Sequence, residues 1–334
     1  MKKISLLLLA ATTLAQGANA QMTYNDLVEK KASDKNVDTV AWVYSGVLAL
    51  GVSQGILHNW AAGGELASLG INGVFNGSLN HYNHRSIFAN NLDAAYGLFY
   101  IFSNSFVPRK TDDRIDFTSR YGYRLKDSSN FYFTGLLNAR SQFTKGYNYD
   151  VPEWDTFSTS KFLSPLYVTI APGIEYRRGT ELSVFFSPVA SRLTFASKYY
   201  TLKDEAGAYG VEYGKSARYE LGAYASVRYV KDITKSISYR GRLDLYSNYL
   251  AKNTYDGSNV LVKKDNPGNI DILFDNFIAF KFFKYFSFNI GVVAIYDNDV
   301  PYDGAAIPGE PNAMKDLGWW QIKQTMNFGF NYKF

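Results

Sequence analysis

The chain has 334 residues, no cysteine, a formal net charge of +5 and an aromatic content of 17%. The lack of cysteine excludes a disulfide scaffold and a lipid-anchored amino terminus, and the weak, evenly spread positive charge excludes the basic footprint of nucleic-acid binding. The mean hydropathy of −0.20 and the lack of any later apolar run of about 20 residues exclude a helical membrane protein.

The amino terminus is predicted to be a secretory signal peptide over residues 1–20. Two lysines precede the apolar stretch Ile4–Leu14, and Ala18-Asn19-Ala20 has the small residues of a cleavage site. Residues 21–40 are then a polar segment, either a periplasmic tail or a short helix that plugs a lumen. Residues 41–334 form the predicted folded domain.

Alternation of apolar and polar residues predicts strands along the folded domain. At the carboxyl end, aromatic residues at positions 328, 330, 332 and 334 alternate with polar or small residues at 327, 329, 331 and 333. Successive side chains of a strand point to opposite faces, so one face is aromatic and the other polar. The predicted strands are Trp42–Leu57, Gly64–Leu79, Arg85–Phe102, Asp113–Leu125, Asn130–Phe143, Lys161–Arg177, Thr180–Phe195, Ala217–Lys231, Lys235–Leu250, Asn269–Phe283, Tyr285–Tyr296 and Gly318–Phe334.

Short and long connections alternate between these segments. The short turns are His81–His84, Lys126–Ser129, Arg178–Gly179, Asp232–Thr234 and Lys284, and longer linkers separate the other pairs. Short periplasmic turns and long outer loops are typical of bacterial outer-membrane barrels, which have an even number of strands. The sequence therefore predicts an all-β fold, a transmembrane antiparallel barrel of about twelve strands. The alternative is a soluble β-sandwich.

The polar face of the strands is predicted to line the lumen, because charged side chains that face lipid cost several kilocalories per mole. Two interpretations remain open. The charges could line a channel that leans basic and favours small anionic solutes, or they could pair and close the lumen. The predicted lumen-facing residues are Asp93, Asp116, Arg120, Arg124, Arg140, Glu175, Arg177, Arg218, Glu220, Arg228, Arg240, Arg242, Asp244, Asp271, Asp275 and Lys281.

The stretch "LHNWAAGGE" begins at Leu57, between the first two predicted strands. Gly63 and Gly64 suit a tight strand connection or bulge. A phosphate-binding glycine loop needs a following helix, and none is predicted here. Trp60 is expected to pack at the rim of the barrel, with contact to a carbohydrate or a partner as the alternative.

Several short motifs resemble a known family. They are Asn59-Trp60-Ala61-Ala62-Gly63-Gly64, Asn91-Leu92-Asp93, Tyr96-Gly97, Phe162-Leu163-Ser164-Pro165, Ser187-Pro188, Tyr209-Gly210-Val211, Glu220-Leu221-Gly222-Ala223-Tyr224 and Ile295-Tyr296-Asp297. On these motifs the chain resembles the DUF3078 family of outer-membrane β-barrel proteins of the Bacteroidota. The resemblance covers nearly all of the mature chain and implies its location and architecture, but no activity.

Candidate catalytic and metal-binding groups are sparse. His81 and His84 lie in a predicted turn and His58 at the other end, without the aligned serine and orienting acid that nucleophilic catalysis needs. Asp297, Asp299 and Asp303 supply oxygen ligands of the kind that Ca²⁺ prefers, but their spacing is not that of a calcium loop. We expect no cofactor, no catalytic site and no firm metal site.

The predicted function is that of a non-enzymatic protein of the outer membrane of a Gram-negative bacterium. It would act as a narrow passive channel or as a structural component of the envelope. The alternatives are an accessory subunit that docks on another envelope complex and, less favoured, a lipid-modifying enzyme. The expected partners are outer-membrane lipid and, depending on the role, small anionic solutes or an envelope complex.

Overall fold

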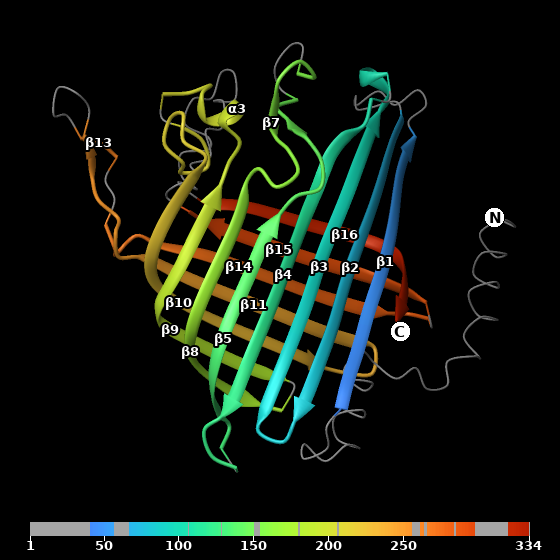
Figure 1. Cartoon of the computed structure of the whole chain (residues 1–334). Coiled ribbons are helices and arrows are strands. Elements are labelled where there is room, and N and C mark those ends of the chain that lie inside the picture. Colours follow the sequence, from blue (N-terminus) through green and yellow to red (C-terminus); the bar gives the residue numbers. More distant parts are fainter. Residues whose placement is uncertain are drawn as a thin grey trace, which may run out of the picture.

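A closed barrel of twelve antiparallel strands forms the body of the protein (Figure 1). The computed structural model describes residues 41–56, 67–105, 107–127, 129–149, 154–179, 181–205, 207–255, 261–263, 266–283, 285–297 and 320–333. The barrel strands are β1 (Ala41–Ile56), β2 (Ala67–Asn83), β3 (Ser86–Ile101), β4 (Arg109–Arg124), β5 (Phe131–Ser141), β8 (Leu166–Arg178), β9 (Leu182–Phe195), β10 (Ala217–Asp232), β11 (Ile237–Asn248), β14 (Ile270–Lys281), β15 (Phe286–Tyr296) and β16 (Trp320–Lys333).

Each strand pairs with the next barrel strand along the chain, and β1 pairs with β16 to close the ring. The predicted all-β barrel of about twelve strands is confirmed. Four short strands and two helical turns lie between barrel strands, at the long-loop end: β6 (Gly146–Tyr147), β7 (Ser158–Ser160), β12 (Thr254–Tyr255), β13 (Leu261–Lys263), η2 (Phe102–Asn104) and α3 (Lys198–Thr201).

The connections are sorted by length, as the sequence predicts. In Figure 1 the short turns lie at the lower end of the barrel, and α3, β7 and β13 rise from the upper end. Three predicted boundaries are wrong by four residues or more. β2 continues to Asn83, so His81 is a strand residue, and β4 begins at Arg109 because a bulge after Gly97 lets Arg109 pair with Phe99. β8 begins at Leu166 and not at Lys161.

Several predictions fall outside the described residues. These are the signal peptide over residues 1–20, the polar segment 21–40, the Trp60, Gly63 and Gly64 motif, and Asp299 and Asp303. Among the described residues, no helix is long and apolar enough to cross a membrane.

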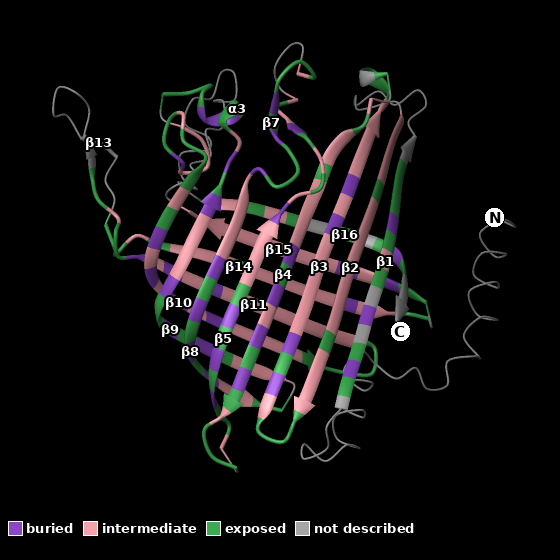
Figure 2. Cartoon of the chain, viewed as in Figure 1, coloured by how far each residue is buried: buried purple, intermediate pink, exposed green. Residues whose placement is uncertain are grey.

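The outer face of the barrel is apolar. On β16, Ile322, Met326 and Phe328 expose 58%, 59% and 68% of their surface. The register places large apolar side chains of the neighbouring strands on the same face, and Figure 2 shows exposed and buried residues alternating along many strands. An apolar exterior around a charged interior is the arrangement of a membrane-spanning barrel.

A bulge in β9 reshapes one wall of the barrel. The register between β9 and its neighbours shifts around Ser187 and Pro188, and Pro188 has no N–H for the ladder. Gly173 and Gly222 flank the bulge, where an added Cβ would lie 2.2 Å from a carbonyl oxygen of β9 and 1.9 Å from one of β11. Before the bulge the odd-numbered residues of β9 face inward, and after it the even-numbered ones do. Phe185 therefore lies on the inner face, where it is fully buried.

The assignment of the outer face predicts how the barrel responds to an added charge. Met326→Arg places a guanidinium on the exposed middle of β16 and should reduce the free energy of unfolding by about 2–4 kcal/mol. Asn72→Arg, on the half-exposed inner face of β2, should change it by less than about 1 kcal/mol. Urea unfolding of the barrel folded in phospholipid vesicles measures both values, and equal losses would contradict the assignment.

Candidate functional site

The inner face of the barrel carries its charged residues. The register places all sixteen predicted lumen-facing residues on the face opposite to the exposed aromatic side chains. The same register places Arg114, Arg192 and Lys323 there as well. Arg114 and Lys323 have the same parity as the other polar residues of their strands, so the alternation in the sequence is enough to place them on the inner face. Arg192 was hidden because the β9 bulge reverses the parity between it and Phe185.

The inward side chains of β4 reach across the lumen one after another. The neighbours of β4 are β3 and β5, so a contact with any of β10 to β16 must cross the interior. At the long-loop end, Asp112 pairs with Lys323 of β16 at 2.6 Å. Arg114 then pairs with Asp275 of β14 at 3.0 Å.

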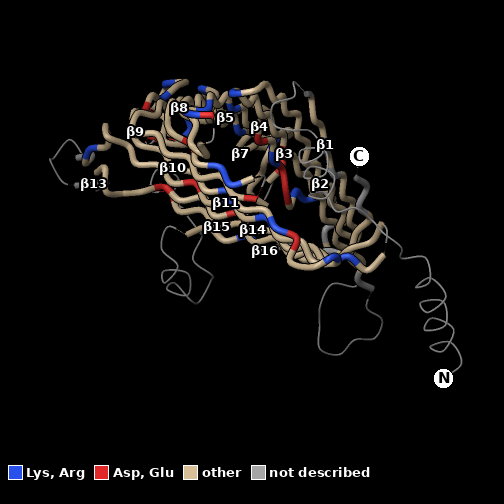
Figure 3. The backbone as a smooth tube through the Cα atoms, turned by 90° about the horizontal axis from the view of Figure 1, so that it is seen from below, with Lys and Arg blue, Asp and Glu red and all other residues tan. Residues whose placement is uncertain are grey.

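Deeper along β4, the partners on the opposite wall lie on β11 and then on β10. Asp116 accepts a hydrogen bond of 2.8 Å from Arg242 of β11. Thr118 accepts one of 3.2 Å from Arg228 of β10. In Figure 3, a view from below, β1–β5 lie opposite β10–β16 and the section of the barrel is flattened. The ion pairs from β4 to β11, β14 and β16 show that side chains span it.

Arg120 and Glu175 form the most buried ion pair of the set, with N–O 2.9 Å. Glu175 also accepts hydrogen bonds from Ser183 at 2.6 Å and Thr134 at 3.1 Å, and its Oε1 lies 3.0 Å from Arg177. A carboxylate without exposed surface is stable in the charged form only with such partners. The pair therefore locks β4 to β8 and β9.

Asp244 links the Arg120–Glu175 pair to the Arg242–Asp116 pair. Its carboxylate accepts hydrogen bonds from Ser226 at 2.7 Å and from Arg242 at 2.7 Å. Ser226 in turn lies 3.4 Å from Arg120. A continuous polar network thus runs from Glu175 to Asp116, across six strands of the barrel.

Apolar side chains fill the lumen beside this network. Its inner cluster consists of Leu136, Ala171, Phe185, Ala190, Tyr224 and Tyr246, which are all buried. Above it, Arg192 pairs with Asp271 and its guanidinium lies 3.6 Å from the centre of the Tyr246 ring. The lumen is therefore filled at the depth of this cluster, beside β8, β9, β10 and β11.

Exposure of the ion pairs falls with depth along β4. The two side chains are 41% and 24% exposed in Lys323–Asp112, and 27% and 16% exposed in Arg114–Asp275. They are 12% and 4% exposed in Arg242–Asp116, and only 3% and 0% in Arg120–Glu175. The lumen is thus accessible to water at the long-loop end and filled further down. We call the accessible part, bounded by β1–β4 and β14–β16, the vestibule.

Below the vestibule, at the short-turn end of the barrel, buried side chains fill the lumen. Ile87, Ala89 and Tyr132 form a buried cluster against Tyr82. On the opposite wall, Ser287 and Asn289 of β15 are 1% and 2% exposed. We call these residues the floor of the vestibule. The register also places Tyr82 and Asn289 on inner faces.

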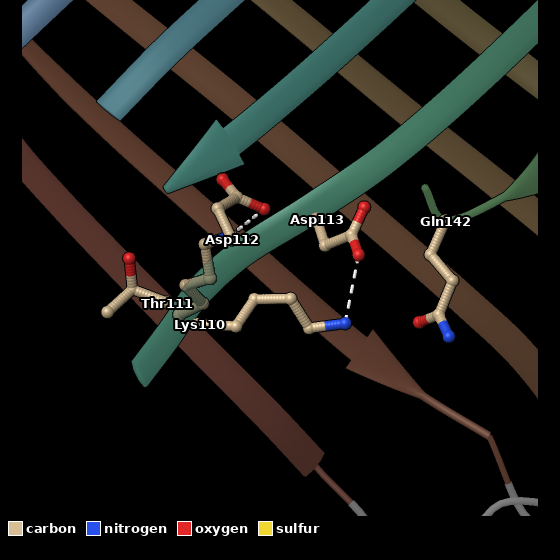
Figure 4. A pocket seen from close by; sticks show the side chains of 6 residues that line it. Lys110, Thr111, Asp112, Asp113 and Gln142 are labelled. Atoms are coloured by element: carbon tan, nitrogen blue, oxygen red, sulfur yellow. Dashed lines mark hydrogen bonds and ion pairs between the residues drawn. The ribbon is translucent and has the colours of Figure 1, made fainter. Parts of the chain in front are cut away.

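A shallow polar pocket of about 240 Å³ lies at the mouth of the vestibule (Figure 4). Lys110, Thr111, Asp112 and Asp113 of β4 line it together with Gln142 and Lys323. Asp113 pairs with Lys110 at 2.9 Å, as Figure 4 shows, and accepts hydrogen bonds from the backbone N–H groups of residues 143 and 144. Asp113 thus holds the start of the loop after β5 at the mouth.

Two long loops pack on each other above β8 and β9. Ser158 and Tyr200 share a hydrogen bond of 3.0 Å, and Ser164 accepts one of 2.7 Å from the N–H of Ser197. Burial raises the pKa of the Tyr200 hydroxyl. Lys203 donates to the carbonyl of Ser158 at 3.1 Å. These contacts fix the loops beside the vestibule mouth.

The candidate metal ligands that the structure describes do not form a cluster. The described residues contain no group of three or more His, Cys, Asp or Glu side chains that could hold a metal ion. The His81 ring packs against Trp42 with ring centres 4.6 Å apart. His84 lies in the adjoining turn with φ +42°. Of the three loop aspartates, only Asp297 is among the described residues.

Residues 52–147, which include the whole of β2, β3, β4 and β5, match the model of a family described as "Protein of unknown function (DUF3078)". Comparison with curated proteins finds no match.

Among solved structures, the chain is similar to the translocator domain of autotransporter NalP from Neisseria meningitidis, with 10% identity, 98% of each chain covered and a TM-score of 0.37. It is also similar to the COG4313 outer membrane channel from Pseudomonas putida F1, with 10% identity, 87% of this chain and 95% of that chain covered and a TM-score of 0.35. A FadL homologue from Pseudomonas aeruginosa shares 11% identity over 88% of each chain, with a TM-score of 0.27.

The buried ion pair at the base of the network predicts a large effect on stability. Glu175→Gln leaves Arg120 and Arg177 without their carboxylate and should lower the free energy of unfolding by about 3–5 kcal/mol. Glu181→Gln removes the carboxylate of a 3.6 Å pair with Arg178 that is largely exposed, and should cost less than about 1 kcal/mol. Urea unfolding in vesicles compares the two variants, and similar small losses would show that the network is not stabilising.

Proposed function

We propose that the protein is an outer-membrane β-barrel that admits small polar solutes to an outward-facing vestibule and is closed at its short-turn end. The long loops face outward and the short turns face the periplasm, as in bacterial outer-membrane barrels. The family match over residues 52–147 supports placing the whole chain in that family, and the resemblance of its motifs favours a bacterium of the Bacteroidota. The proposal assigns no catalytic step to the protein.

The exposure gradient along β4 carries this proposal. An open pore would leave inner-face side chains accessible at every depth, whereas a filled barrel would bury them all. Here the side-chain exposure of Lys323 is 41% at the mouth, and that of Glu175 is 0% in the deepest pair. Buried Tyr132 and Ser287 then close the other end of the vestibule. Passage through the barrel therefore requires the floor to move.

The chemistry of the vestibule favours hydrated solutes. The inward positions of β2 carry serine, asparagine and glycine between single valine and tyrosine residues, and Asn72 and Asn76 are half-exposed. Asp93 and Arg240, 24% and 35% exposed, pair at 3.4 Å near this wall. Amide and hydroxyl groups next to paired charges offer hydrogen bonds to water and polar molecules, but little apolar surface. The mouth pocket of about 240 Å³ has room for a small molecule.

Labelling of single cysteines tests the vestibule directly, because the natural chain has none. Asn72→Cys lies on the half-exposed inner face of β2 and should react with a charged, membrane-impermeant maleimide added outside intact cells. Ser287→Cys lies in the floor, where the side chain is 1% exposed, and should react only after denaturation. Equal labelling of the two positions, or an unreactive Asn72→Cys, would contradict an outward-facing vestibule.

Conductance in planar bilayers tests the floor. The natural protein should pass little steady current, because buried side chains fill the short-turn end. Tyr132→Ala removes a side chain that is 5% exposed in the floor and should open measurable single-channel currents. Phe133→Ala, at the neighbouring position on the outer face, with 54% exposure, is the matched control and should remain silent. Large steady currents from the natural protein would show that the floor does not close the barrel.

A further inference from the structure

Two arginine side chains on the inner face, Arg109 and Arg140, form neither a hydrogen bond nor an ion pair with a residue that the structure describes, and both lie over a tyrosine ring. Arg114, Arg240 and Lys323 each have a carboxylate partner within 3.4 Å. Arg140, on the inner face of β5, donates no hydrogen bond and forms no ion pair with any residue that the structure describes. Its side chain is half-exposed. A guanidinium that faces accessible lumen without a partner keeps its five N–H donors for another molecule.

The acid nearest to Arg140 in register is already engaged. Asp116 lies directly opposite Arg140 in the β4–β5 ladder. One of its carboxylate oxygens accepts a hydrogen bond from Arg242, and the other accepts one from Asn138. Its side chain is only 4% exposed. Asp116 therefore screens the charge of Arg140 from a neighbouring position without occupying its donors.

An aromatic ring holds the guanidinium of Arg140. Its central carbon lies 5.2 Å from the centre of the Tyr167 ring, and Tyr167 is the residue opposite Arg140 on β8. Stacking on a ring uses the flat face of a guanidinium and leaves the N–H groups in its plane free. Gln142, two residues further along the chain, lines the mouth pocket. The guanidinium is thus oriented at the edge of the vestibule.

We propose that Arg140 binds a small oxyanion, a carboxylate or a phosphate, in the vestibule, and so sets its preference for anionic solutes. The planar fork of an arginine fits two oxygens of one such group. The positive charge of Arg140 repels a cation, and the carboxylate nearest in register, Asp116, is already paired with Arg242. This inference rests on the proposed vestibule and names the class of solute that it receives.

Calorimetric titration of the purified full-length protein in detergent tests the proposal, with inorganic phosphate and acetate as separate probes and choline as the cationic control. Arg140→Gln should weaken phosphate and acetate binding by about tenfold or more, the loss expected for a charge-assisted hydrogen bond. Arg140→Lys keeps the positive charge but loses the planar fork of the guanidinium. Its affinity for both anions should lie between that of the natural protein and that of Arg140→Gln. Comparison of the phosphate and acetate arms shows which oxyanion the site prefers.

Lys281→Gln is the matched control. Lys281 is an inner-face cation at the short-turn end of β14, so its loss changes the charge of the lumen without touching the site. Binding by Lys281→Gln should stay within about twofold of the natural protein. Unchanged binding in Arg140→Gln, or equal weakening in both variants, would overturn the assignment. If Asn72→Cys is labelled from outside but neither anion binds, the result supports the vestibule and contradicts the anion-binding role of Arg140.

Discussion

The structure depends on the pairing of buried charges across the lumen from a single strand. A charge taken out of water is tolerated only with a close partner of opposite sign and further hydrogen bonds. The inner face of β4 meets this requirement with Lys323 and Arg242 on the opposite wall and with Glu175 of β8 deep inside. Because these side chains have limited reach, the walls must lie close together, which agrees with the flattened section in Figure 3.

The same constraint explains why one side of the lumen is filled and the other is accessible. Around Arg120, the network borders the apolar cluster of Phe185, Tyr224 and Tyr246, and both side chains of the Arg120–Glu175 pair are buried. In the described strands β1, β2 and β15, no inward register position holds a charged residue. Short neutral side chains there neither reach the opposite wall nor fill the space. The vestibule lies beside this neutral wall.

The alternation of apolar and polar residues was sufficient to predict the strands and the face that each residue occupies, because successive side chains of a strand point to opposite sides. Parity does not give the height of a residue or its partner across the barrel, so the pairing of Arg114 with Asp275 was not predictable. A single bulge at Ser187 was enough to hide Arg192. Of the two interpretations left open for the lumen, pairing is seen at several depths along β4, and the exposure of the pairs falls from the mouth downward.

The unpaired state of Arg140 follows from the geometry of the β4 ladder. The inward residues of β4 from Asp112 to Thr118 have their partners on strands of the far wall, which draws Asp116 towards Arg242 and away from its own neighbour on β5. Local pairing within the β4–β5 ladder would have neutralised Arg140 and left Arg242 with Asp244 alone. The cross-lumen contact that fills the centre of the barrel therefore also frees a cation at the edge of the vestibule. Closure of the lumen and the availability of an anion site are, in this fold, two consequences of one set of ion pairs.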